Sequence, residues 1–269
     1  MDHTKDQWGE RFATCVNGVN IFAMGADYIP EDHLLGRVTP ETRDKEFGGW
    51  YSGITSDGKI LPNKQCYAHA FVILAASSAI LAGKSEAKKL LQDALDVYDL
   101  RFWNEEEGLS CDTWNTEFTK LDSYRGINAN MHTVEAFLAA ADVTGNQIYR
   151  IRAGRIIRHV IAWAGENDWR IPEHFTSDWI ADLECNKDHP ADQFKPYGAT
   201  PGHGIEWARL IVQWAVSTYQ DDEKNQLLST VWPGKSDLYH AFQATLIPYN
   251  RVDLSIACAI KEKKDGGLE

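Results

Sequence analysis

The feature of this sequence that most constrains its fold is a repeat of two amphipathic segments, a short turn and a long aromatic-rich stretch. Apolar residues recur with a period of about 3.6 over residues 63–81, 129–143 and 203–219, which predicts helices there. The starts of these helices are about 65–75 residues apart, longer than in ordinary solenoid repeats. The pattern predicts an all-α fold of helical hairpins, with the long loops gathered on one face.

The first two of these helices are each expected to have a partner that completes a hairpin. A second amphipathic helix is predicted from about residue 85 to 103, with Leu91, Leu95 and Tyr98 on its buried side. Another is predicted over residues 147–164, after a Thr-Gly-Asn turn. A last short helix is predicted over residues 237–246.

The stretches between the hairpins contain turn signals and many aromatic residues. Asp57-Gly58, between aromatic and β-branched segments, predicts a short two-stranded element. The chain has ten tryptophans and ten tyrosines. Aromatic rings can line a sugar site, or they can form an ordinary core, and composition leaves both interpretations open.

Charge and composition exclude several classes of function. The formal net charge is −12, which argues against a nucleic-acid partner held by phosphate contacts. The sequence contains neither an apolar run long enough for a membrane span nor a signal-peptide pattern, so a cytoplasmic protein is expected. Its five cysteines show no zinc-binding spacing, which favours reduced thiols.

Two histidines occur in the same local setting. His132 is followed three residues later by Glu135, and His203 is followed in the same way by Glu206. Residues three apart share one helix face, so each motif is expected to direct an imidazole and a carboxylate to one point. Two such motifs predict a repeated helical scaffold with a polar centre.

His203 is the candidate general base. It lies near the predicted start of a helix, which disfavours the imidazolium and keeps a neutral, basic ring. The alternative is a capping or core histidine, and the sequence leaves both open. His240 lies in the opening turn of a short predicted helix, where Asp237 could orient it.

His132 lies beside Asn128 and Asn130, so that amide, imidazole and carboxylate could converge, which suits recognition of hydroxyl groups. Helix capping by either asparagine is the alternative. A carboxylate-rich metal site is a rival use of the two motifs, but the neighbouring loops offer aromatic residues rather than further ligands. No nucleotide-binding or serine-hydrolase motif is present. We therefore expect no metal and no cofactor.

Four ordered motifs resemble the N-acylglucosamine 2-epimerase superfamily, and within it the mannose and sulfoquinovose aldose–ketose isomerases. They are Lys64-Gln65-Cys66-Tyr67-Ala68-His69-Ala70-Phe71, Asn128-Ala129-Asn130-Met131-His132, Pro201-Gly202-His203-Gly204-Ile205-Glu206-Trp207 and Asp237-Leu238-Tyr239-His240. The resemblance covers residues 44–220 and 230–250. It implies an (α/α)6 barrel and cofactor-free isomerisation of a monosaccharide through a cis-enediol.

The resemblance also implies roles for individual residues. His203 and His240 match the two histidines that act as acid and base. Tyr67, Asn128, His132 and Glu206 match positions that contact the substrate. A sugar 2-epimerase is the near alternative, because it shares the proton abstraction.

The sequence departs from that family in two places. It lacks the family's first helices and skips several others after residue 219, which predicts an incomplete barrel whose exposed apolar faces promote self-association. Residues 16–40 instead resemble a segment of β-mannosidases. We therefore expect an irregular segment over 1–43, the isomerase-like domain over 44–250 and a tail over 251–269. A β-mannosidase-type hydrolase and a non-catalytic sugar-binding fragment remain alternatives.

Overall fold

The computed structural model describes residues 42–55, 57–192 and 195–218, together with the backbone of four short strands near the N-terminus. The chain divides into two compact units, Met1–Pro30 and Glu31–Glu269. The first unit holds two antiparallel pairs: β1 (Lys5–Asp6) with β2 (Gly9–Glu10), and β3 (Thr14–Val16) with β4 (Val19–Ile21). Most of the β-mannosidase-like segment lies outside the described residues.

The second unit contains the helices that the sequence predicts. They are α2 (Cys66–Leu81), α3 (Ala87–Arg101), α4 (Ile127–Thr144), α5 (Ile148–Glu166) and α6 (Pro201–Thr218). Each agrees with its predicted range to within a few residues at either end. The helix predicted over residues 237–246 lies outside the described part of the chain. None of the helices described here combines the length and the apolar character that crossing a membrane requires.

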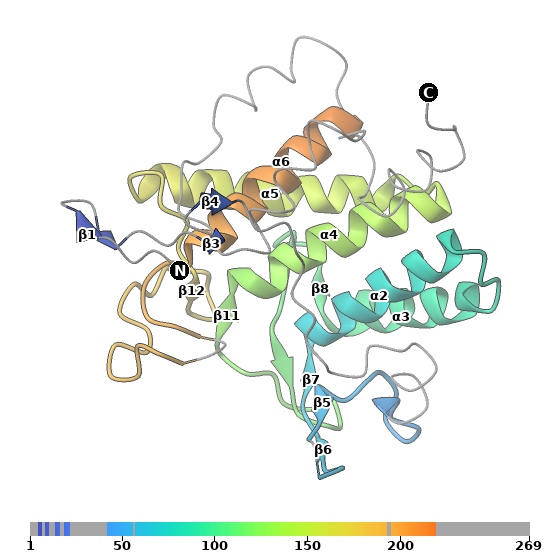
Figure 1. The fold of residues 1–269 in the computed structure, drawn as a ribbon. Coiled ribbons are helices and arrows are strands. Elements are labelled where there is room, and N and C mark those ends of the chain that lie inside the picture. Colours follow the sequence, from blue (N-terminus) through green and yellow to red (C-terminus); the bar gives the residue numbers. More distant parts are fainter. Residues whose placement is uncertain are drawn as a thin grey trace, which may run out of the picture. The chain divides into compact units, whose positions relative to one another are not determined.

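Helix α4 is the centre of this unit. It packs against α2 on one side and α5 on the other, α3 packs on α2, and α6 packs against both α4 and α5 (Figure 1). Met131, Val134 and Phe137 of α4 are fully buried in the continuous apolar core. This burial places the residues of α4 that face α2 and α6 at the middle of the unit.

The apolar stripe that predicts α2 lies on the more open side of that helix. Tyr67 and Phe71 each keep 37% of their surface exposed, whereas Cys66, Ala70 and Ile73 form the buried face. The helical period predicted for α2 is therefore confirmed. The apolar residues of this helix form two faces, one buried in the core and one partly exposed. The aromatic face is the one that reaches the candidate site.

Short strand pairs fix the starts of helices α2 and α4. The predicted hairpin at Asp57-Gly58 is present as β5 (Gly53–Ile54) paired with β6 (Ile60–Leu61). Strand β7 (Lys64–Gln65) leads directly into α2 and pairs with β10 (Thr113–Trp114), while β8 (Trp103–Asn104) pairs with β9 (Leu109–Ser110). Strand β11 (Arg125–Gly126) leads into α4 and pairs with β12 (His174–Phe175). The long loops are thereby tied to the helix ends that carry the site residues.

Candidate active site

His132 lies on α4 between aromatic rings of α2 and carboxylates of α4 and α6. Its ring centroid is 5.1 Å from that of Tyr67 and 4.7 Å from that of Phe71. Asn128 lies one turn earlier on α4, so that it shares a helix face with His132. The side-chain oxygen of Asn128 is buried and has no hydrogen-bond partner among the described residues. That oxygen can accept a hydrogen bond from a hydroxyl group brought to the site.

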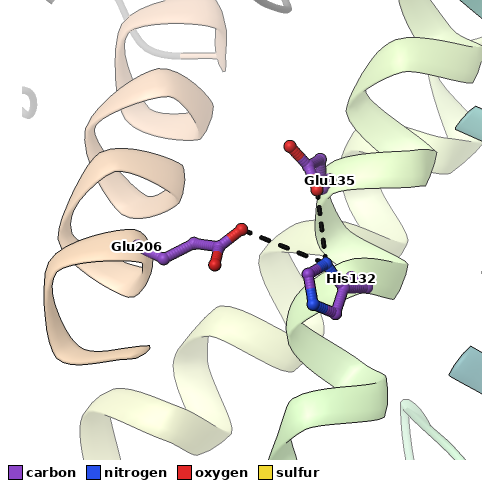
Figure 2. A group of neighbouring side chains, drawn as sticks. All are labelled: His132, Glu135 and Glu206. Carbon is purple, nitrogen blue, oxygen red and sulfur yellow. Dashed lines mark hydrogen bonds and ion pairs between the residues drawn. The ribbon is translucent and has the colours of Figure 1, made fainter. Parts of the chain in front are cut away.

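Two carboxylates and a guanidinium surround the imidazole of His132. Nδ1 of His132 lies 3.3 Å from Oε2 of Glu135 and 4.0 Å from Oε1 of Glu206. Figure 2 shows Glu206 reaching from α6 toward the ring, while Glu135 approaches it from α4 itself. The Nη2 atom of Arg209, on α6, lies 2.8 Å from Oε1 of Glu135 and 3.6 Å from Oε1 of Glu206. The site therefore joins α4 to α6 through charged groups.

Burial and charge act in opposite directions on Glu135. Burial alone would raise the pKa of its carboxyl group, but the guanidinium of Arg209 and the hydrogen bond with His132 outweigh that effect and lower the pKa to about 2. Glu135 is therefore a fixed negative charge at neutral pH. Such a charge favours a proton on the Nδ1 atom of His132 that faces it.

His203 has a carboxylate partner from a different part of the chain. Its Nδ1 atom lies 2.9 Å from Oε2 and 3.1 Å from Oε1 of Glu173, a buried residue in the loop between α5 and α6. His203 is the third residue of α6, near the N-terminus that the sequence predicts. The pair is thus an imidazole oriented by a carboxylate, an arrangement that suits proton transfer.

The structure brings three of the predicted site residues together. Tyr67 from α2, His132 from α4 and Glu206 from α6 meet around one ring. His203 lies one turn before Glu206 on the same face of α6, so its ring belongs to the same side of the fold. His240 lies outside the described residues, and its role as the second acid–base group remains a prediction.

One part of the expected site is wrong. Asn130 faces away from His132 into the core, where its amide bonds both backbone groups of Ser110. Capping by Asn128 or Asn130 is also contradicted, because Gly126 is the N-cap residue of α4 and no side chain caps it. The amide that can serve the site is therefore that of Asn128.

The residues that could hold a cation are also those that surround His132. Within the described part of the chain, His132, Glu135 and Glu206 form a group of potential metal ligands whose ligand atoms lie within 4.8 Å of one another. Arg209 already supplies a positive charge to both carboxylates. A divalent ion would have to compete with that guanidinium, so the donor set does not favour a metal.

Sequence reasoning missed two residues of the site. Arg209 could have been found, since it lies three residues after Glu206 and so shares its helix face. Glu173 offers no local signal, because it lies in a loop thirty residues from His203. Only the tertiary fold brings that pair together.

Comparison with known proteins identifies the family of this chain. The N-acylglucosamine 2-epimerase (GlcNAc 2-epimerase) family model matches residues 32–224. The chain belongs to this family. A D-mannose isomerase of Pseudomonas cannabina pv. alisalensis is 46% identical over 183 residues, which make up 67% of this chain and 44% of that protein. A D-mannose isomerase of Thermobifida fusca is 45% identical over 183 residues, 67% of this chain and 45% of that protein. The chain thus matches less than half the length of these relatives.

Solved structures show the same fold. A crystal structure of D-mannose isomerase superimposes with a TM-score of 0.65 and 30% identity, covering 72% of this chain and 51% of that one. A cellobiose 2-epimerase from Spirochaeta thermophila DSM 6192 gives a TM-score of 0.59 at 18% identity, covering 72% of this chain and 49% of that one. The predicted fold class, helices of the (α/α)6-barrel type, is confirmed.

Proposed function

We propose that this chain is a shortened, cofactor-independent aldose–ketose isomerase that acts on mannose or a closely related monosaccharide. The proposal rests on one observation above all, the pairing of His203 with buried Glu173 beside the carboxylate cluster of α4 and α6. The D-mannose isomerases to which the chain is similar support the choice of substrate. No cofactor is needed for this chemistry, because the proton moves between neighbouring carbons of the sugar.

The proposed reaction begins with removal of the proton at C2 of the open-chain aldose. Glu173 accepts a hydrogen bond from the Nδ1–H group of His203, which leaves the lone pair of that ring on Nε2. Nε2 takes the C2 proton, and the electrons of the broken C–H bond form the cis-enediol as the carbonyl oxygen at C1 gains a proton. Return of a proton to C1 and loss of one from the C2 hydroxyl then give the ketose. We assign the second acid–base role to His240.

The remaining site residues hold the sugar in this account. Asn128 accepts a hydroxyl hydrogen through its buried oxygen. His132, whose Nδ1–H faces Glu135, accepts a hydroxyl hydrogen of the sugar at its other ring nitrogen. Tyr67 places an aromatic ring against the apolar face of the sugar beside His132. Glu206, whose carboxylate lies near His132, accepts hydroxyl hydrogens of the sugar.

The test is incubation of the full chain with D-mannose while the sugar products are separated by chromatography. His203→Gln is the test variant, and His189→Gln is its control because His189 lies exposed on the loop before α6. We expect fructose to form with the wild type and with His189→Gln, and to fall by about 10³-fold with His203→Gln, as expected for loss of a general base.

Other products would overturn the proposal in distinct ways. Formation of glucose in place of fructose would identify a 2-epimerase, which returns the proton to the carbon from which it came. Release of nitrophenol from a nitrophenyl mannoside, with no ketose formed, would identify a glycoside hydrolase. Cooperative thermal unfolding with no turnover of either sugar would identify a non-catalytic sugar-binding fragment.

A further inference from the structure

Glu173 is anchored by its backbone as well as by its side chain. Its carbonyl oxygen accepts the backbone N–H of Ile127, the first residue of α4, at 3.0 Å. Its Oε1 atom accepts the backbone N–H of Thr200, just before α6, also at 3.0 Å. One residue therefore links the starts of the two helices that carry His132 and His203.

The neighbouring residue, His174, further restricts the backbone on which Glu173 lies. His174, in β12, places its Nδ1 atom 2.8 Å from the hydroxyl of Tyr124 and its Nε2 atom 2.8 Å from the carbonyl oxygen of Pro196. Strand β12 itself pairs with β11. The backbone of Glu173 is thus held in place, and its carboxylate cannot swing away from His203 without also losing the hydrogen bond from the N–H of Thr200.

We propose that Glu173 is a positioning residue that fixes the tautomer and the ring orientation of His203. The proposal rests on the function assigned to His203 above. An ionised carboxylate is only an acceptor, so it holds the Nδ1–H tautomer and keeps the basic lone pair on Nε2. An imidazole that is free to exchange tautomers or to rotate would present the wrong nitrogen to the sugar for part of the time.

Glu173→Gln is the variant that separates positioning from a purely structural role. The amide oxygen can still accept the Thr200 N–H, so the link between the two helices is kept, but the amide nitrogen can donate to Nδ1 and permits the other tautomer. Glu184→Gln is the matched control. It removes the same charge from an exposed side chain of the same loop.

The first readout is the ¹⁵N spectrum of His203 in the full chain at about pH 8.5, well above the ordinary imidazole pKa of about 6.5. The signals that vanish in His203→Gln identify the ring. We expect a protonated Nδ1 in the wild type and in Glu184→Gln, and a mixture of tautomers in Glu173→Gln. An unchanged Nδ1–H tautomer in Glu173→Gln would overturn the proposal, whether or not the chain isomerises mannose.

The second readout is steady-state isomerisation. We expect kcat to fall by about 10²-fold in Glu173→Gln while KM changes by less than about threefold. The sugar still binds, but the basic nitrogen of His203 is no longer held in position to remove the C2 proton. A rise in KM with kcat unchanged would show that Glu173 serves only sugar binding and would overturn the proposal. Absence of turnover in the wild type would refute the proposed function but leave the tautomer measurement valid.

Discussion

The two His-x-x-Glu motifs look alike in the sequence and differ in the structure. In the first motif, His132 bonds its own partner Glu135 within α4, at 3.3 Å. In the second, His203 bonds Glu173 from a distant loop, and Oε1 of Glu206 lies 4.0 Å from Nδ1 of His132. The repeat therefore supplies two equivalent helix positions, and the loops decide what each position does. In the proposed reaction, the charged groups around His132 hold the substrate, and Glu173 orients His203 as the base.

The largest expected effect distinguishes the two histidines directly. We expect His203→Gln to lower kcat for mannose isomerisation by about 10³-fold, because a general base is lost. We expect His132→Gln to raise KM and to lower kcat/KM by about 10- to 100-fold with a smaller change in kcat, because binding contacts are lost. Initial rates over a range of mannose concentrations separate the outcomes. Equal losses of kcat in both variants would break the comparison.

A substitution at Arg209 tests, through the stability of the fold, how strongly the charged groups around His132 are coupled. Replacing it with methionine leaves Glu135 and Glu206 buried without their cation, which should lower the free energy of unfolding by about 3 kcal/mol or more. Urea denaturation gives the value. The control is Arg170→Met, which breaks an exposed pair with Asp168 and should cost less than about 0.5 kcal/mol. Similar losses in both variants would show that the cluster is not strongly coupled.

Glu135 gives the same charged groups a pH dependence. Its pKa in the fold is about 2, below its ordinary value of 4.5. A lowered carboxyl pKa stabilises the fold above pH 4.5, and this stabilisation is lost as the pH falls toward 2. Over that window the free energy of unfolding should fall by about 3 kcal/mol at most through this one group.

Glu135→Gln is the variant that isolates this contribution. Because glutamine does not titrate, the difference in unfolding free energy between wild type and variant should shrink as the pH falls from about 4.5 toward 2. Urea denaturation at several pH values measures it. A difference that is constant across that range would contradict the proposed charge on Glu135.

The smallest expected effect on stability concerns the packing of α6, the helix that carries both His203 and Glu206. Gly154 of α5 packs so closely on Trp214 of α6 that an added Cβ would lie 2.3 Å from the indole. Trp214 cannot retreat easily, because its Nε1 atom donates to the carbonyl oxygen of Arg150 at 2.9 Å. Gly154→Ala should therefore cost about 1–3 kcal/mol in thermal or urea unfolding.

The control for this substitution lies in the same helix. A Cβ added at Gly165 meets no atom within 4 Å, so Gly165→Ala should leave stability unchanged or raise it by up to about 1 kcal/mol. If Gly154→Ala were equally harmless, the contact between Gly154 and Trp214 would not be what holds α6 against α5.

The helices were predictable because their signals are local. The periods of α3, α4, α5 and α6 and the turn at Asp57-Gly58 follow from neighbouring residues alone. The aromatic stripe of α2 shows the limit of such reasoning, since Tyr67 and Phe71 mark the face toward the site rather than the face in the core. Periodicity finds an apolar face but cannot say what covers it.

The site was predictable only in part, for a related reason. His132 and Glu206 entered the prediction through the repeated motif and Tyr67 through resemblance, and the fold brings all three around one ring. Glu173 lies thirty residues from His203, and no pattern links them. Long-range pairs depend on how loops return to helix ends, which here is set by the pairing of β11 with β12.

The most direct test of the separate roles proposed for His203 and His132 is deuterium exchange into the sugar during incubation of the chain with saturating mannose in D₂O. The account predicts deuterium next to the carbonyl carbon with the wild type and, at a comparable rate, with His132→Gln. It predicts almost none with His203→Gln. Exchange that persists in His203→Gln, or that is lost to the same extent in His132→Gln, would contradict the assignment of proton transfer to the His203–Glu173 end of the site.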